Sequence, residues 1–169
     1  MSIVGQLQQH SKIASCVVTI LPSKRICEAC VLMRDNSIGS LVVVDSNRQL
    51  VGMITERDII CKVVSMGLDV SQTQVSEAMT TEVFTCTAQT TIQQAKDMMA
   101  QHCVRHLPIM DGQNVVGMVS SRDILLKQLS DTRAVIHQQL NILHDLERSH
   151  PGITSLKKDE MGRVVIQCN

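Results

Sequence analysis

The sequence has almost no aromatic residues: it contains no Trp, no Tyr and a single Phe, Phe84. Proteins that bind single-stranded nucleic acids stack bases on exposed aromatic rings, and this chain lacks that platform. An excess of one charge is also missing, because 16 Lys and Arg residues balance 16 Asp and Glu residues. Nucleic-acid-binding domains are usually strongly basic. The sequence therefore predicts no nucleic-acid partner.

Long apolar runs are absent as well. No apolar stretch approaches the ~20 residues that span a bilayer. Residues 1–5 lack the basic region and apolar stretch of a secretory signal. We therefore expect no membrane partner and a cytoplasmic location. The seven cysteines are an odd number and several lie among apolar residues, so we expect reduced core thiols of a cytosolic protein and no disulfide framework.

Recognisable catalytic motifs are missing too. The sequence has no Walker-type loop and no G-x-G-x-x-G, and no Ser-His-Asp or Cys-His pattern suggests an activated nucleophile. Cys27-x-x-Cys30 and His102-Cys103-x-x-His106 have metal-ligand residue types but no second ligand pair. We therefore expect no enzyme activity, no catalytic residues and no metal site.

One nine-residue stretch occurs twice, as VGMITERDI at 51–59 and VGMVSSRDI at 116–124. Each copy predicts a short strand, then a hydroxyl residue, two spacers and an aspartate that opens a helix. The hydroxyls of Thr55 and Ser120 can cap the helix start, where free N–H groups attract anions. The carboxylates of Asp58 and Asp123 can accept hydrogen bonds from a ribose diol. The pattern therefore suits a phosphorylated ligand that contains ribose.

The flanking pattern repeats as well, with an offset of 66 positions before a hairpin turn and 65 after it. In the first copy we predict strands at 16–20, 41–44 and 50–54, a helix at 24–34 capped by Ser23, and a helix at 58–66. In the second copy the first strand falls at 83–86. A three-stranded sheet with two helices is too small to bury both faces, so the copies should pack together. The predicted fold is α+β: two tandem β-α-β-β-α repeats related by a pseudo-two-fold axis.

A long helix and a small hairpin follow the repeats. Apolar residues continue at coiled-coil spacing after Asp123 to about residue 148, with Arg133 filling the one gap. Residues 156–159 and 164–166 read as two strands of a hairpin. The expected organisation is 1–68 for the first repeat with a helical or partly ordered lead-in over 1–15, 75–128 for the second repeat, 129–150 for the terminal helix and 151–169 for a β tail.

The paired stretches resemble those of cystathionine-beta-synthase (CBS) domains, and the VRHLPI stretch at 104–109 is typical of that family's second strand. The resemblance covers roughly residues 10–128. It implies a Bateman module, in which two CBS repeats leave two clefts between their sheets. Such modules commonly bind AMP, ADP, ATP, S-adenosylmethionine or NAD, form homodimers and regulate an attached or partner effector protein. AMP or ATP is the regulatory ligand that we favour.

The resemblance also implies site residues. Thr55 and Asp58 belong to one cleft and Ser120 and Asp123 to the other, with each aspartate on ribose and each hydroxyl near phosphate. We expect the Ser120–Asp123 cleft to be the better site, because Arg105 and His106 offer more donors than Gly39 and Ser40. The other residues implied at the clefts are Thr19 and Thr85 on the first strands, Arg57 and Arg122 near phosphate, and Pro108 in the second strand.

Three other interpretations stay open at this point. The hydroxyl and aspartate pairs are equally explained as helix caps and dipole partners. The chain is also interpretable as a ligand-free structural or dimerisation module of a bacterial signalling protein, with the helix at 124–148 as its working part. A redox sensor built on Cys27 and Cys30 is the third, and it requires unusually acidic thiols.

Overall fold

The structure is a computed structural model that describes residues 4, 17–149, 153–158 and 164–168. It divides into two compact units, residues 1–125 and 126–169. Apart from Val4, the lead-in predicted over 1–15 lies outside the described residues. Within the described ranges no helix is long and apolar enough to cross a membrane.

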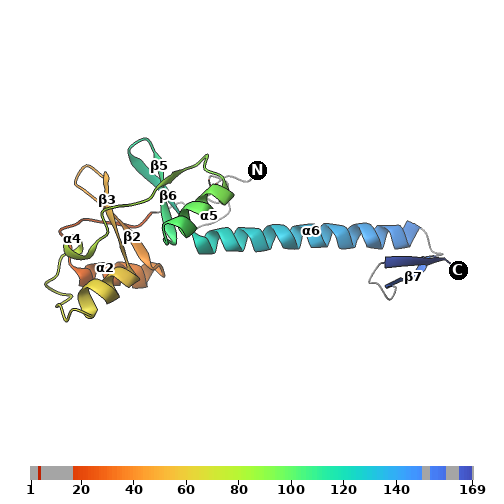
Figure 1. Ribbon diagram of the computed structural model, residues 1–169, viewed down its shortest axis with the longest axis horizontal. Coiled ribbons are helices and arrows are strands. Elements are labelled where there is room, and N and C mark those ends of the chain that lie inside the picture. The colour runs from red at the N-terminus through yellow and green to blue at the C-terminus, as the bar shows by residue number, and fades with distance from the viewer. Residues whose placement is uncertain (1–3, 5–16, 150–152, 159–163, 169) are drawn as a thin grey trace. The chain divides into compact units, whose positions relative to one another are not determined.

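The first unit contains two three-stranded sheets, each with a helix beside it (Figure 1). In each sheet the first strand pairs in parallel with the central strand, and the third strand pairs with it in antiparallel. This arrangement confirms the predicted α+β fold of two β-α-β-β-α repeats. The first repeat comprises β1 (Thr19–Ile20), α2 (Ile26–Asn36), β2 (Ser40–Val44), β3 (Leu50–Thr55), α3 (Glu56–Ile59) and η1 (Ile60–Val64). After α4 (Val75–Ala78), the second comprises β4 (Cys86–Thr87), α5 (Ile92–Gln101), β5 (His106–Asp111), β6 (Asn114–Ser120) and the start of α6 (Ser121–Ser149).

The strand register confirms the two sequence offsets. Ser40 faces Thr55 in the first sheet, and His106 faces Ser120 in the second. Val43 likewise faces Gly52. The central strands therefore match at an offset of 66 and the third strands at 65, so the one-residue difference lies in the hairpin turn.

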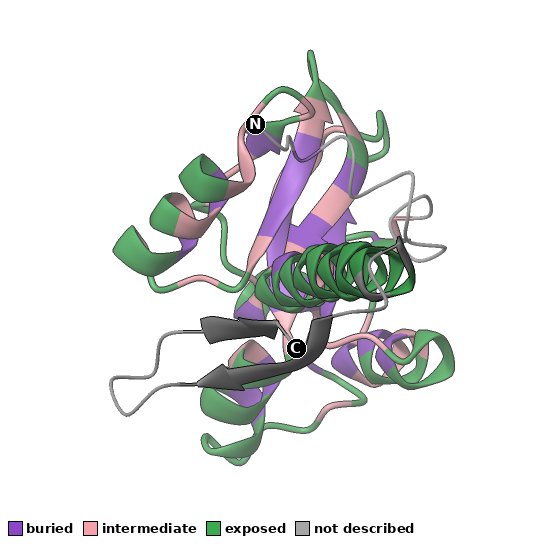
Figure 2. Ribbon diagram, turned by 90° about the vertical axis from the view of Figure 1, so that its right-hand side faces the viewer, coloured by how far each residue is buried: buried purple, intermediate pink, exposed green. Residues whose placement is uncertain are grey.

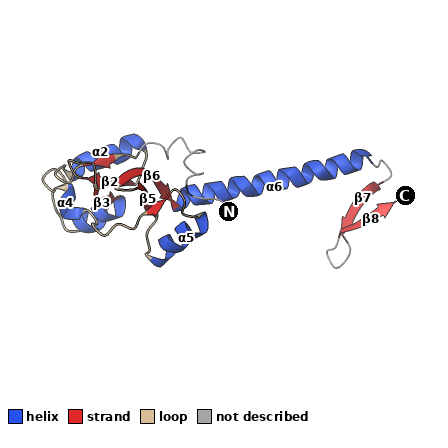
Figure 3. Ribbon diagram, turned by 90° about the horizontal axis from the view of Figure 1, so that it is seen from above, coloured by secondary structure: helices blue, strands red, loops and turns tan. Residues whose placement is uncertain are grey.

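Each repeat has its own apolar core, and Figure 2 shows that buried residues concentrate in the strands. All five residues of β2 are buried, because α2 packs beside its sheet (Figure 3). Ile26, Leu41 and Ile54 are completely buried in the first core, as are Leu107 and Ile109 in the second. The aliphatic composition therefore suffices to fill both cores.

A valine that precedes each repeat in the chain packs against the other repeat. The Val75 N–H donates to the carbonyl of Lys24 over 2.8 Å, and the Val4 N–H donates to the carbonyl of Thr90 over 2.8 Å. Lys24 and Thr90 stand at equivalent positions, 66 apart. Val75 is fully buried in the core of the first repeat, and Val4 is fully buried in that of the second. Val4 and Val75 are therefore exchanged, and each completes the core of the other repeat.

Truncating one exchanged valine should destabilise the whole first unit. We expect Val75→Ala to lower the free energy of unfolding by about 2 kcal/mol, because it leaves a cavity in a packed core. Urea denaturation followed by circular dichroism measures the change. Val31→Ala is the control, since Val31 is 43% exposed on α2 and should change stability by less than about 0.5 kcal/mol. Equal midpoints for Val75→Ala and the wild type would contradict the exchanged packing.

Several predicted boundaries in the repeats are wrong, and the strand expected at 16–20 begins only at Thr19. The helix expected at 24–34 begins at Ile26, and its start is stabilised by the Glu28 carboxylate, which accepts from the Arg25 N–H over 2.8 Å, and not by Ser23. The helix expected at 58–66 begins at Glu56 and continues as a π-helix from Ile60.

The start of the strand expected at 83–86 is also wrong, because β4 begins only at Cys86. In the first repeat the Val42 N–H donates to the Val18 carbonyl, which extends the pairing of β1. Pro108 stands at the position equivalent to Val42 and has no N–H to donate. The strand pairing is therefore lost at the corresponding step.

The cysteines also differ from expectation. Five described cysteines are free, but only Cys86 is buried, and Cys30, Cys61 and Cys103 are exposed. The described cysteines are therefore not core residues as a group. The helical spacing of α2 directs Ile26, Ala29 and Met33 into the core. Cys27 and Cys30, on the same helix, therefore lie outside the core.

The second unit contains α6 beyond Leu125 and a two-stranded sheet. β7 (Ile153–Lys158) and β8 (Val164–Cys168) pair in antiparallel. The predicted long helix and small hairpin are therefore confirmed, although β7 begins three residues earlier than predicted. The turn between the strands lies outside the described residues.

Candidate functional site

Thr55 and Asp58 cap the helix that follows β3. The Asp58 N–H donates to the Thr55 hydroxyl over 3.2 Å, and the Thr55 N–H donates to Asp58 Oδ2 over 3.0 Å. The Thr55 hydroxyl also donates to Asp58 Oδ2. These reciprocal bonds satisfy N–H groups that the helix itself leaves unpaired.

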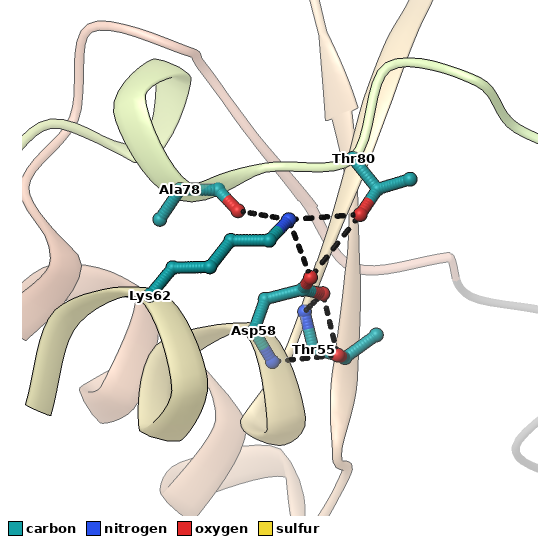
Figure 4. Close-up of polar contacts among 5 residues, drawn as sticks. All are labelled: Thr55, Asp58, Lys62, Ala78 and Thr80. Carbon is teal, nitrogen blue, oxygen red and sulfur yellow. Dashed lines mark hydrogen bonds and ion pairs between the residues drawn. The ribbon is translucent and has the colours of Figure 1, made fainter. Parts of the chain in front are cut away.

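The other carboxylate oxygen of Asp58 is bound by Lys62 of η1 and by Thr80 of the connector after α4 (Figure 4). Lys62 Nζ lies 2.8 Å from Asp58 Oδ1, and the Thr80 hydroxyl donates to the same oxygen over 3.1 Å. Lys62 also donates to the Ala78 carbonyl over 2.9 Å. Burial raises the pKa of Asp58, but its bonds with Lys62 and Thr55 outweigh that effect and hold the pKa below its ordinary value. Asp58 is therefore an ionised acceptor fixed in orientation.

The second repeat builds the same cap, but the lysine at the equivalent position pairs with another residue. The Ser120 N–H donates to Asp123 Oδ2 over 2.9 Å, and the Asp123 N–H donates to the Ser120 hydroxyl over 3.2 Å. Lys127 stands at the position equivalent to Lys62, but it pairs with Asp131 at 2.7 Å. The two aspartates therefore share their capping geometry, but Lys62 pairs with Asp58 whereas the equivalent Lys127 pairs with Asp131.

A cavity of about 200 Å³ lies between the repeats and is lined by residues of both. The first repeat contributes the end of β3 and the start of α3. The second contributes the segment before β5, and the connector after α4 forms a third wall. Its lining residues are Met53, Thr55, Arg57, Asp58, Thr80, Glu82, Val83, Phe84, Cys103, Val104, Arg105 and His106.

The cavity lining combines the fixed carboxylate of Asp58 and the carboxylate of Glu82 with the basic side chains of Arg57, Arg105 and His106. Arg57 and Arg105 are exposed, so their guanidinium groups remain in contact with water. Guanidinium groups bind phosphate with paired hydrogen bonds. Burial lowers the pKa of His106, and the neighbouring Arg105 lowers it further, against the opposing effect of Asp123 and Glu56. Anions and hydroxyl groups can therefore be bound side by side.

The pH dependence of stability should reveal the half-buried imidazole of His106. Unfolded histidine has a pKa of about 6.5, and the folded value of His106 lies lower. The unfolded chain therefore binds protons more readily, so stability is lost as the pH falls below about 6.5 toward the folded pKa. We expect His106→Gln to lose less stability than the wild type between pH 7.5 and 5.5, measured by urea midpoints. An identical loss in both proteins would contradict this.

Arg105 and His106 lie between the two predicted clefts. Both line the cavity that contains Thr55 and Asp58. His106 also faces Ser120 across the sheet, and the Ser121 N–H donates to the Arg105 carbonyl over 3.0 Å. Their assignment to the Ser120–Asp123 cleft alone therefore stays a prediction.

The other predicted site residues lie outside the lining of this cavity. Pro108 is fully buried in β5, and Ser40 is buried in β2. A Cβ on Gly39 would lie 2.8 Å from a carboxylate oxygen of Glu56, so Gly39 lets this side chain approach. Thr85 is half-buried before β4, while Thr19, which lines a separate groove beside α2, and Arg122 are exposed.

Several lining residues were not predicted from the sequence. Thr80, Glu82 and Val83 come from the connector, whose path depends on the exchanged packing of α4. Phe84 stacks on His102, with ring centroids 3.6 Å apart and planes 16° from parallel. The one feature of the sequence that could have indicated Phe84 as a site residue is that it is the only Phe, Tyr or Trp in the chain.

The Cys30 thiol is not the unusually acidic thiol that a redox sensor requires. Burial raises the pKa of Cys30, and the neighbouring Cys27 raises it further. His102 packs against Phe84, and no group of three or more His, Cys, Asp or Glu among the described residues could hold a metal ion.

Comparisons with known proteins agree on one family. The model of the CBS domain matches residues 12–65 and 75–130. The CBS domain-containing protein YhcV of Bacillus subtilis is 39% identical over 118 residues, which cover 70% of this chain and 83% of YhcV. The chain spans about half the length of some other curated relatives.

Solved structures extend the agreement to the fold. A protein with CBS domains from Burkholderia ambifaria superposes with a TM-score of 0.73 at 30% identity, covering 77% of this chain and 96% of that one. The CBS domain pair of protein MJ0100, solved with 5′-methylthioadenosine and S-adenosyl-L-methionine, has a TM-score of 0.67 at 24% identity and covers 79% and 98%. The duplicated stretches, the two matched segments and the shared fold agree: this chain belongs to the CBS-domain family and carries a tandem pair of CBS domains.

Proposed function

We propose that the chain is a regulatory module that senses an adenosine-containing nucleotide bound between its two CBS repeats. The observation that carries the proposal is the cavity between the repeats, where the Asp58 carboxylate and the Arg57 and Arg105 guanidinium groups line one space. A carboxylate suits the ribose diol, and paired guanidinium groups suit phosphate.

The cavity offers a different environment for each part of a nucleotide. Met53, Val83, Phe84 and Val104 provide apolar and aromatic surface for the base. The cavity is smaller than the ~300–1,000 Å³ of most ligand pockets, so the phosphates would lie outside it against the exposed arginines. Lys62 and Thr80 hold Asp58 in the orientation that the ribose would meet. AMP or ATP is the ligand that we favour.

A solved structure of similar fold supports an adenosine-containing ligand. MJ0100 was solved with two adenosine compounds, and its likeness to this chain is one of fold. The equivalent pair Ser120 and Asp123 is built in the same way, so we propose it as a second, weaker position for the same class of ligand, with Arg122 near its phosphate.

A nucleotide in the cavity would contact both repeats and therefore favour the arrangement in which they fit it. Ser120 and Asp123 form the start of α6, so a change in this arrangement would reach the terminal helix directly. The recipient would be an effector protein or a second copy of this chain. In this proposal the module regulates and does not catalyse.

Isothermal titration of the full chain with AMP, ADP, ATP, NAD and S-adenosylmethionine tests the proposal. We expect saturable heat from at least one of them, and a matching rise in thermal stability because the ligand binds only the folded chain. No heat and no thermal shift from any of the five would overturn it. A chain that ends after Lys127 should retain binding, since it keeps the whole cavity lining.

A further inference from the structure

α6 is exposed over most of its length (Figure 2), and its exposed residues include a row of apolar side chains. Leu126, Leu129, Ile136, Leu140 and Leu143 are each between 42% and 57% exposed. Most helices depend on packing of an apolar face for their stability in water, and contiguous apolar surfaces mark sites of interaction. This row, which we call the α6 seam, therefore needs a partner.

Charged side chains of α6 lie on the side opposite the seam. Lys127 and Asp131 form an ion pair one turn apart on this side, with 2.7 Å between Lys127 Nζ and Asp131 Oδ1. The charged side chains thus leave the seam free for packing. Coiled-coil helices have the same division between an apolar seam and a charged outer face.

The order of residues in the seam identifies the partner as a second copy. The seam positions, with Arg133 included, follow one another at steps of three, four, three, four and three. Two such helices can therefore pack in opposite directions with every seam position filled. We propose that a second copy of this chain docks on the α6 seam with its helix antiparallel: Leu126 would contact the partner's Leu143, and Leu129 would contact the partner's Leu140.

Charge and flanking residues favour the antiparallel direction. In a parallel pair Arg133 would face the partner's Arg133 in one layer, whereas the antiparallel pair places Arg133 against the partner's Ile136. Leu125 and Leu146 flank the seam on one side and are 56% and 51% exposed. They would contact each other across an antiparallel pair, but a parallel pair would place Leu125 beside a polar residue, the partner's Ser130. The antiparallel pair therefore buries more apolar surface.

Charge reversal across one layer tests both the partner and the direction. Sedimentation of the full chain without nucleotide should show a dimer. Leu126→Glu alone and Leu143→Lys alone should each raise the dimer dissociation constant at least about 10-fold. The double variant should restore the dimer, because the antiparallel pair brings the new carboxylate against the new ammonium group. Ile142→Lys is the matched control, since Ile142 is 52% exposed but lies off the seam.

Different outcomes of this experiment would overturn the dimer and its antiparallel direction. A monomeric wild type, or single variants that dimerise as tightly as the wild type, would overturn the proposal. Single variants that dissociate without rescue in the double variant would overturn the antiparallel direction. Helix content from circular dichroism confirms that each variant is folded. The test uses no nucleotide, so its result is independent of whether the cavity binds one.

Discussion

Replacing Arg105 with alanine is expected to weaken AMP binding by about 10- to 100-fold. A hydrogen bond to a charged group contributes about 1.5–3 kcal/mol, and each 1.4 kcal/mol corresponds to a factor of ten in affinity. Arg105 lines the cavity but remains exposed, so its loss should leave the fold intact. Isothermal titration of the wild type and the variant measures the ratio of dissociation constants.

Two comparisons make this experiment specific. Arg34→Ala removes an exposed arginine from α2, which lies outside the cavity lining, and should leave affinity unchanged. Asp58→Asn and Asp123→Asn report on the two helix caps separately. If the cavity is the main site, Asp58→Asn should cause the larger loss. A larger loss from Asp123→Asn would instead place the nucleotide at the second cap, and unchanged affinity in Arg105→Ala would remove Arg105 from the phosphate site.

Replacing Gly52 with valine is expected to lower the free energy of unfolding by about 3 kcal/mol. A Cβ at this position would lie 2.9 Å from Met79 Sδ and 3.0 Å from the Thr80 carbonyl oxygen, and overpacking of this kind is strongly destabilising. The Thr80 backbone cannot move aside freely, because it exchanges hydrogen bonds of 2.8 and 2.9 Å with Met53. Urea denaturation measures the loss.

Gly67→Ala provides the contrast for Gly52→Val. Gly67 has a φ of 67°, and a Cβ added there would meet no atom within 4 Å, so its substitution costs only backbone strain, about 1 kcal/mol. Because Thr80 lines the cavity and also binds Asp58, Gly52→Val should weaken nucleotide binding as well, whereas Gly67→Ala should not. Equal stabilities of the two variants would contradict the close approach at Gly52.

The repeat architecture was predictable because the sequence repeats in register. The glycines of β3 and β6, the hydroxyl caps and the apolar spacing of α2 and α5 all recur at fixed offsets, and each is a local signal. Capping by Thr55 and Asp58 was equally local, since four consecutive residues supply every atom of the motif.

The cavity lining was less predictable because it depends on contacts between distant segments. Thr80 reaches Asp58 only because the connector pairs with β3 at Met53. The placement of Arg105 beside Thr55 follows from the packing of one repeat on the other, which sequence spacing does not encode. The shortened β4 was predictable in principle, because Pro108 lacks the backbone N–H that the central strand would donate to β4.

The exchange of Val4 and Val75 also constrains how the chain folds during synthesis. The first core stays incomplete until Val75 has left the ribosome, and Val4 must wait for Thr90 before its N–H finds an acceptor. Joining segments so far apart in the chain carries a loop-closure cost and slows folding. The first repeat therefore exposes apolar surface until Val75 has been translated, and the second core is completed only when Val4 joins it.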